Sequence, residues 1–265
     1  MKCQQIIDAL EKLSPRQYAS DWDNVGLLVG RRDSEVHRIM VSLDATKEVI
    51  EMAVEQQVDM LVTHHPMIFS SIKQINGDSF VSDKILTLAE NRICCYAMHT
   101  NFDVIGGMAE LAAGEQYLKL MEVSSIEISG ESGQGMGRYG RLPKPMTAQQ
   151  AADYVKEKFG LSFVMLYQGK ENEGQIFEHI AVMPGAGKSE MERVREQGYS
   201  LYLTGDYGHH AGLDAIDMGM TVIDATHYGL EHIFVAYIAD YLRGLLSETG
   251  IEVIEVDTGC PVRIL

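Results

Sequence analysis

The sequence predicts an α/β protein built from two related lobes, in which mixed, mainly parallel sheets are flanked by helices. Short apolar runs alternate with amphipathic stretches along the chain, and several of these runs end abruptly in polar residues. Alternating strands and helices are typical of mainly parallel sheets, and polar strand ends are typical of the edge where ligands bind. At 265 residues the chain is long enough for two such lobes, each with its own core.

Apolar periodicity places the expected elements. Strands are expected at residues 27–29, 39–43, 61–63, 93–98, 162–167, 179–183, 201–204, 221–226 and 252–256. Helices are expected at residues 3–13, 47–57, 81–91, 108–117, 147–159 and 189–197, and over residues 230–245.

A glycine-rich stretch divides the chain. Glycine stands at nearly every second or third position of residues 129–140, and two prolines follow. Such a composition is typical of a boundary between compact units. We therefore expect a discontinuous lobe formed by residues 1–127 and 221–265, and a second α/β lobe at residues 128–220.

Composition and charge limit the functions to be considered. With 22 basic and 38 acidic residues the net charge is −16, so broad attraction to a nucleic-acid backbone is not expected. The N-terminus lacks the apolar core of a signal peptide, and no apolar run is long enough to span a membrane. The four cysteines show no C-x-x-C spacing and are interpreted as reduced packing residues. These patterns predict a cytoplasmic protein.

Two adjacent histidines end one of the expected strands. The run at residues 61–63 is followed by His64, His65 and Pro66. Neighbouring side chains on a strand point to opposite faces, so the two imidazoles can reach one centre only where the strand ends and the backbone bends. The proline restricts His65 to extended or turn geometry, which suits such a bend.

Potential ligands follow two more of the expected strands. His99 and Asp103 come after one strand, and His227 and Glu231 are four residues apart at a strand-to-helix junction, where they can face the same point. Imidazoles and carboxylates without thiolates suit zinc, manganese, iron or similar divalent ions. The set exceeds what one tetrahedral ion needs, which favours two ions roughly 3.5–4 Å apart. The alternative of unrelated polar loop residues is disfavoured by the recurrence at three strand ends.

The turn Pro184-Gly185-Ala186-Gly187-Lys188-Ser189 invites comparison with a phosphate-binding loop. The first glycine of that motif would fall on Val182, so the G-x-x-x-x-G-K-[ST] pattern fails. Backbone amides and Lys188 can still hold an anion at the start of the following helix. A simple tight turn is the other interpretation.

Taken together, these motifs resemble the NIF-three-like family, whose members are often labelled GTP cyclohydrolase 1 type 2 homologues. The resemblance runs in order over nearly the whole chain and rests on these segments: Asp21-Trp22-Asp23-Asn24-Val25-Gly26, Thr63-His64-His65-Pro66, His99-Thr100-Asn101-Phe102-Asp103, Thr204-Gly205-Asp206 through His210, and His227 with Glu231. One departure is the turn at residues 185–188, where family members often carry a serine, so its role stays open.

The resemblance implies two divalent metal ions per chain (Zn, Mn or Fe), held by His64, His65, Asp103, His227 and Glu231, with Glu231 as the bridge. It also implies two related α/β lobes and a toroidal homohexamer whose metal sites face an inner cavity.

The leading functional hypothesis is a metal-dependent hydrolase of a nucleotide or related phosphorylated heterocycle. For a GTP-type substrate, water would attack the purine ring carbon while His99 or His210 moves protons. Lys188 or Arg138 would offset the substrate's charge. A phosphoesterase is an alternative with the same centre. The other class of function considered is non-enzymatic: a metal-binding ring scaffold or a partner-binding regulatory protein.

Overall fold

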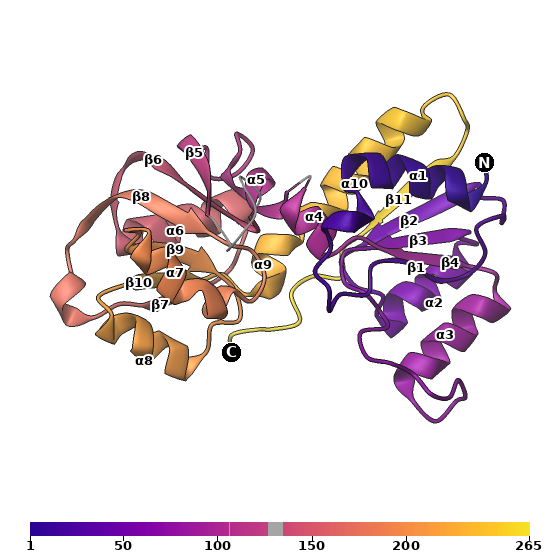
Figure 1. Ribbon diagram of the computed structural model, residues 1–265, viewed down its shortest axis with the longest axis horizontal. Coiled ribbons are helices and arrows are strands. Elements are labelled where there is room, and N and C mark those ends of the chain that lie inside the picture. Colours follow the sequence, from indigo (N-terminus) through magenta and orange to yellow (C-terminus); the bar gives the residue numbers. More distant parts are fainter. Residues whose placement is uncertain (106, 127–134) are drawn as a thin grey trace. The chain divides into compact units, whose positions relative to one another are not determined.

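The computed structural model describes residues 1–105, 107–126 and 135–265, and these divide into two compact units, each with a sheet flanked by helices (Figure 1). The first unit comprises Met1–Gly106 and Phe234–Thr258, and the second comprises Gly107–Ile233 and Gly259–Leu265. The α/β class is therefore confirmed. Residues 127 and 128, where the boundary between the lobes was expected, lie outside the described residues. The second unit already begins at Gly107, so residues 107–126 belong to it rather than to the first lobe as expected.

The first unit contains a five-stranded sheet with the order β1-β4-β3-β2-β11. Its strands are β1 (Gly26–Val29), β2 (Arg38–Ser42), β3 (Met60–Thr63), β4 (Cys94–Ala97) and β11 (Glu252–Val256). Only β1 pairs antiparallel among these described strands. The helices are α1 (Cys3–Leu13), α2 (Lys47–Glu55), α3 (Phe80–Glu90), α4 (Thr100–Val104) and α10 (Ile233–Leu246), with a 3-10 turn at Arg16–Tyr18.

The parallel strands β2, β3 and β4 bring the three segments that follow them to one edge of this sheet. Strands β3 and β4 are buried along their whole length, which is why they read as continuous apolar runs. Immediately beyond β3 the backbone amides of His64 and His65 both donate to the carbonyl of Leu43, at 3.2 and 3.1 Å. This shared acceptor produces the bend that the histidine pair requires.

The last part of the chain returns to the first unit. Strand β11 pairs in parallel with β2, and the Tyr241 hydroxyl of α10 donates to the carbonyl of Ala9 in α1 at 3.0 Å. The helix expected over residues 230–245 begins earlier, with α9 (His227–Glu231), and continues as α10. His232 between them keeps a helical backbone, so the interruption is slight.

The second unit contains a six-stranded sheet with the order β5-β6-β8-β9-β10-β7. Its strands are β5 (Met121–Ile126), β6 (Gly137–Thr147), β7 (Met165–Tyr167), β8 (Ile176–Val182), β9 (Leu201–Thr204) and β10 (Thr221–Asp224). Pairs β8–β9 and β9–β10 are parallel, and the others are antiparallel. The helices are α5 (Met108–Ala113), α6 (Ala148–Phe159), α7 (Met191–Glu196), α8 (His209–Asp217) and α9, with 3-10 turns at Lys170–Asn172 and Gly187–Glu190.

The division into units differs from the one expected from sequence. Strand β10 pairs with β9 and β7, so β10 and the helix α9 that follows it belong to the second unit rather than to the first. Strand β6 was not predicted because it contains Pro143 and Pro145. Its pairing with β8 shifts register between Arg141 and Met146, so both prolines lie where the ladder is interrupted.

Across the part of the chain that the structure describes, every helix is too short or too polar to cross a membrane.

Candidate metal centre

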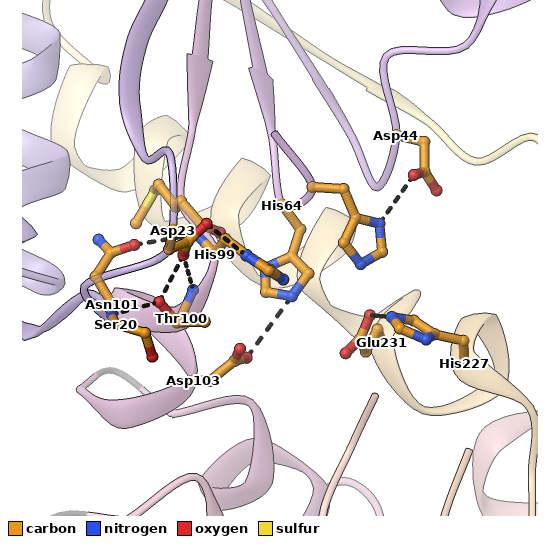
Figure 2. A network of polar contacts seen from close by, with 12 residues as sticks. Ser20, Asp23, Asp44, His64, His99, Thr100, Asn101, Asp103, His227 and Glu231 are labelled. Atoms are coloured by element: carbon orange, nitrogen blue, oxygen red, sulfur yellow. Dashed lines mark hydrogen bonds and ion pairs between the residues drawn. The ribbon is translucent and has the colours of Figure 1, made fainter. Parts of the chain in front are cut away.

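His64 is held in one tautomer at the end of β3. Its side chain is fully buried, and its Nδ1 lies 2.7 Å from the carbonyl oxygen of Met98 (Figure 2). A carbonyl oxygen can only accept, so Nδ1 carries the proton and the lone pair lies on Nε2. That Nε2 is 3.6 Å from Oδ1 of Asp103 in α4. The structure thus brings two of the predicted metal ligands together.

His65 is oriented by a carboxylate that the sequence analysis did not single out. Its Nδ1 lies 2.9 Å from Oδ1 of Asp44, in the turn between β2 and α2. A histidine that donates Nδ1–H to a carboxylate presents a more basic Nε2, which is a common arrangement around protein-bound metal ions. Asp44 follows a strand just as the predicted ligands do, and that position was the signal that could have identified it.

His99 is fixed by Asp23 of the Asp-Trp-Asp-Asn segment (Figure 2). Its Nδ1 lies 2.9 Å from Oδ1 of Asp23, whose Oδ2 accepts a hydrogen bond from the backbone amide of Thr100 at 3.0 Å. Burial by itself raises the pKa of the Asp23 carboxyl, but the hydrogen bonds from His99 and Thr100 outweigh it and lower the pKa from 3.8 to about 2. Asp23 is therefore a carboxylate whenever the protein is folded near neutral pH.

The three imidazoles of the first unit form one group. Ligand atoms of His64, His65 and His99 all lie within 4.8 Å of one another. The ring of Phe234 packs against His64 with centroids 5.1 Å apart, and Phe102 lies 6.2 Å from the same ring. This group, with Asp103 beside it, can hold a divalent ion in a partly apolar surrounding.

In the second unit, His227 and Glu231 meet on α9 as predicted. The Nε2 of His227 is 3.0 Å from Oε2 of Glu231 (Figure 2). The Nδ1 of the same ring is 3.0 Å from Oδ2 of Asp206. The Glu231 side chain is only 4% exposed, and the helix is capped by Thr226, whose side chain accepts from the amide of Gly229. An imidazole and a buried carboxylate held this way form a second pair of potential metal ligands.

The glycine turn at residues 185–188 packs against this pair. Gly185 has a φ of +75°, and a Cβ there would lie 2.8 Å from Oε1 of Glu231. Its carbonyl accepts from the amide of Gly205 at 2.9 Å, and the amide of Gly187 donates to Oγ1 of Thr204 at 3.0 Å. The turn is thus bound to the end of β9 and Lys188 is exposed, which favours the tight-turn interpretation over an anion site.

Asp224 connects the segments that carry Asp206 and His227. It is buried at the end of β10, and its carboxylate accepts from the amides of Tyr207 and Thr226, both at 2.9 Å. Burial raises the pKa of this carboxyl above its ordinary value. The two amides lie next to Asp206 and His227 in sequence, so Asp224 positions the second-unit pair.

Two residues with predicted roles lie in different surroundings. His210 is exposed in the first turn of α8, where its ring contacts that of His209 at 5.3 Å. Its expected role in proton transfer remains a prediction. Arg138 forms an ion pair with Glu110 at 2.6 Å and donates to the carbonyl of Gly137, so its charge is already engaged.

Fold and site together define a class: a two-unit α/β protein whose His and Glu groups can hold a metal ion. The family model Duf34/NIF3 (NGG1p interacting factor 3) matches residues 1–261, and the chain belongs to this family.

Curated and solved relatives agree with this assignment. The chain is 32% identical over 252 residues to the GTP cyclohydrolase 1 type 2 homolog of Clostridium acetobutylicum, covering 95% of this chain and 93% of the relative. The structure of a Bacillus cereus protein related to NIF3 has a TM-score of 0.90 at 20% identity, over 100% of this chain and 99% of that one, and shows the fold alone. Reduced HcgD from Methanocaldococcus jannaschii matches at 30% identity with a TM-score of 0.82, over 97% and 98% of the chains.

We predict that Gly185→Ala lowers metal affinity about 10-fold or more, because its Cβ displaces the Glu231 carboxylate. Gly160→Ala is the matched control: it has a similar φ of +67° but open space around the Cβ. Both variants should lose about 1–2 kcal/mol from the left-handed backbone. Titration calorimetry with Mn²⁺ or Zn²⁺ measures the difference, and equal affinities in the two variants would refute it.

Acid should destabilise the first unit through Asp23. Since its pKa falls from 3.8 to about 2 on folding, its contribution is complete above about pH 4 and is lost as the pH falls toward 2. Between pH 6 and pH 3 the loss should be about 1 kcal/mol. Urea unfolding of chelator-treated protein, followed by the fluorescence of the only tryptophan, Trp22, measures it.

In Asp23→Asn this pH dependence should be reduced by the same amount. Asp33→Asn, at an exposed position, serves as the control and should behave like the wild type. An unchanged acid dependence in Asp23→Asn would show that the His99–Asp23 contact does not stabilise the folded state.

Proposed function

We propose that the protein is a divalent-metal-dependent hydrolase of a nucleotide or a related phosphorylated compound. The observation that carries the proposal is the shared hydrogen-bonding pattern of three imidazoles in the first unit. In His64, His65 and His99 an oxygen acceptor lies at Nδ1, so that Nε2 carries the lone pair. Such a uniform arrangement suits metal ligation and proton transfer, and surface histidines have no need of it.

Two divalent ions per chain would be held by His64, His65, Asp103, His227 and Glu231. Neutral imidazoles and carboxylates fit zinc, manganese or iron by donor type. This ligand set is proposed from the family to which the chain belongs. When bound, divalent ions supply Lewis acidity and lower the pKa of a water molecule.

His99 is the group best suited to move a proton. Its Nδ1–H donates to Asp23, which keeps Nε2 ready to accept a proton, and the carboxylate then stabilises the imidazolium that forms. In this scheme Nε2 takes a proton from the attacking water and returns it to the leaving group. Asp23 orients the imidazole and stays ionised throughout.

The substrate class is proposed from the names of the relatives. Relatives such as the one from Clostridium acetobutylicum carry the name GTP cyclohydrolase 1 type 2 homolog, which supports a purine nucleotide attacked at a ring carbon. A phosphoesterase would use the same groups on a phosphorus atom. A metal-binding scaffold without turnover is the alternative that the experiment below separates from both.

Purified protein reconstituted with Mn²⁺ or Zn²⁺ should contain about two ions per chain and hydrolyse a nucleotide. Glu231→Gln should lower metal affinity about 10- to 100-fold and abolish turnover. Glu248→Gln, an exposed position on the surface, is the control and should leave both unchanged. Elemental analysis and a nucleotide panel provide the two measurements.

The two measurements distinguish the alternatives. Less than about one ion per chain after reconstitution would overturn the metal centre itself. Two ions per chain without turnover of any nucleotide or phosphate ester would leave a metal-binding scaffold.

We also propose a toroidal homohexamer in the cytoplasm, as the family resemblance implies. Light scattering should then give a solution mass six times the chain mass of 29.5 kDa. A monomeric or dimeric mass at micromolar concentration would contradict the ring.

A further inference from the structure

Two large aromatic side chains of the first unit are exposed and packed on each other. Trp22 is 60% and Phe69 is 62% exposed, and their ring centroids lie 5.9 Å apart with a tilt of 53°. An exposed tryptophan paired with an exposed phenylalanine presents apolar area that folding alone does not explain.

This aromatic pair adjoins the histidine group. The ring of Trp22 meets the ring of His99 edge-on, with centroids 5.9 Å apart. The His99 ring in turn lies 5.2 Å from that of His64 and 5.6 Å from that of His65. A ligand that rests on the aromatic pair is therefore within one ring's distance of the group that can hold a metal ion.

The loops that carry the pair are fixed by partly buried hydrogen bonds. The side-chain amide of Asn24 donates to the carbonyl of Ile68 at 2.6 Å, which joins the loop of Trp22 to that of Phe69. The amide of Ser20 donates to Oγ1 of Thr100 at 2.9 Å, and Asp23 holds the other side of the same turn. The pair is thus ordered before any ligand arrives, which reduces the entropic cost of binding.

Charge selects the part of a ligand that this surface accepts. The exposed Asp21 adjoins Trp22, and the chain as a whole carries a net charge of −16, so a phosphate group is disfavoured here. The planar ring of a ligand can stack on Trp22 or on Phe69. The phosphate groups of the same ligand would then point toward the proposed divalent metal ions.

We propose that Trp22 and Phe69 form a platform on which the planar heterocyclic ring of the substrate stacks, beside the histidine group. This inference rests on the proposed function and adds the surface that selects the substrate's ring. The pair determines affinity, whereas the reaction itself is assigned to the groups described above.

The single tryptophan makes the platform directly observable. In the metal-loaded Glu231→Gln variant, GTP and guanosine should quench Trp22 fluorescence, and inorganic tripolyphosphate, which has no ring, should leave it unchanged. Calorimetry on the same samples gives the affinities independently of the fluorescence.

Variants then separate stacking from other roles. Trp22→Ala and Phe69→Ala should each weaken GTP binding about 5- to 100-fold, the range expected for loss of one base–aromatic stack. Phe80→Ala is the control, because Phe80 is 77% exposed in the same unit but faces Lys84. Metal content and solution mass should be those of the wild type in all three variants.

The outcomes distinguish this inference from the proposed function. In one outcome, GTP quenches Trp22 fluorescence and binds more weakly to the two alanine variants while the wild type turns over no nucleotide. That result would support the platform and contradict the proposed hydrolase. Equal GTP affinity in wild type and Trp22→Ala would overturn the platform, as would the absence of GTP and guanosine binding. A changed solution mass in Trp22→Ala would also overturn it, by showing that the pair is a contact between copies of the chain.

Discussion

The arrangement of this protein depends on one kind of interaction, the hydrogen bond from an imidazole Nδ1 to a fixed oxygen. In His64 the acceptor is the backbone carbonyl of Met98, and in His65, His99 and His227 it is a carboxylate. Each bond fixes the plane of an imidazole ring that could otherwise rotate at the end of its strand. In His64, His65 and His99 it also sets the tautomer, whereas the Nε2 of His227 lies 3.0 Å from a carboxylate oxygen of Glu231 as well. The acceptors therefore orient the imidazoles that can hold a metal ion.

The backbone supplies these acceptors through sharp turns at strand ends. Asp44 follows β2, and Asp206 follows β9 with a φ of +51°. A Cβ on Gly205 would lie 2.7 Å from the backbone nitrogen of His227, so only glycine allows the turn and the helix to approach this closely. Close backbone contacts thus hold both the carboxylate and the imidazole in place.

Sequence reasoning singled out the histidines and carboxylates that the structure brings together in each unit, because each follows an apolar run that is readily recognised as a strand. It missed Asp44 because an aspartate before a helix reads equally well as a cap. It missed β6 because prolines within a strand argue against one. It assigned β10 to the wrong lobe because local patterns identify a strand but not the neighbour with which it pairs, and that choice depends on contacts far apart in the chain.

The return of β11 to the first unit has a consequence for synthesis on the ribosome. Strand β2 leaves the ribosome early, but its partner β11 lies some two hundred residues later. At ordinary translation rates this edge of the nascent sheet stays open for about 10–40 s. An open β edge invites pairing with other chains. Almost all of the second unit is encoded between β2 and β11 and can fold during that interval. The second unit can therefore finish folding before the first, although the first begins to emerge earlier.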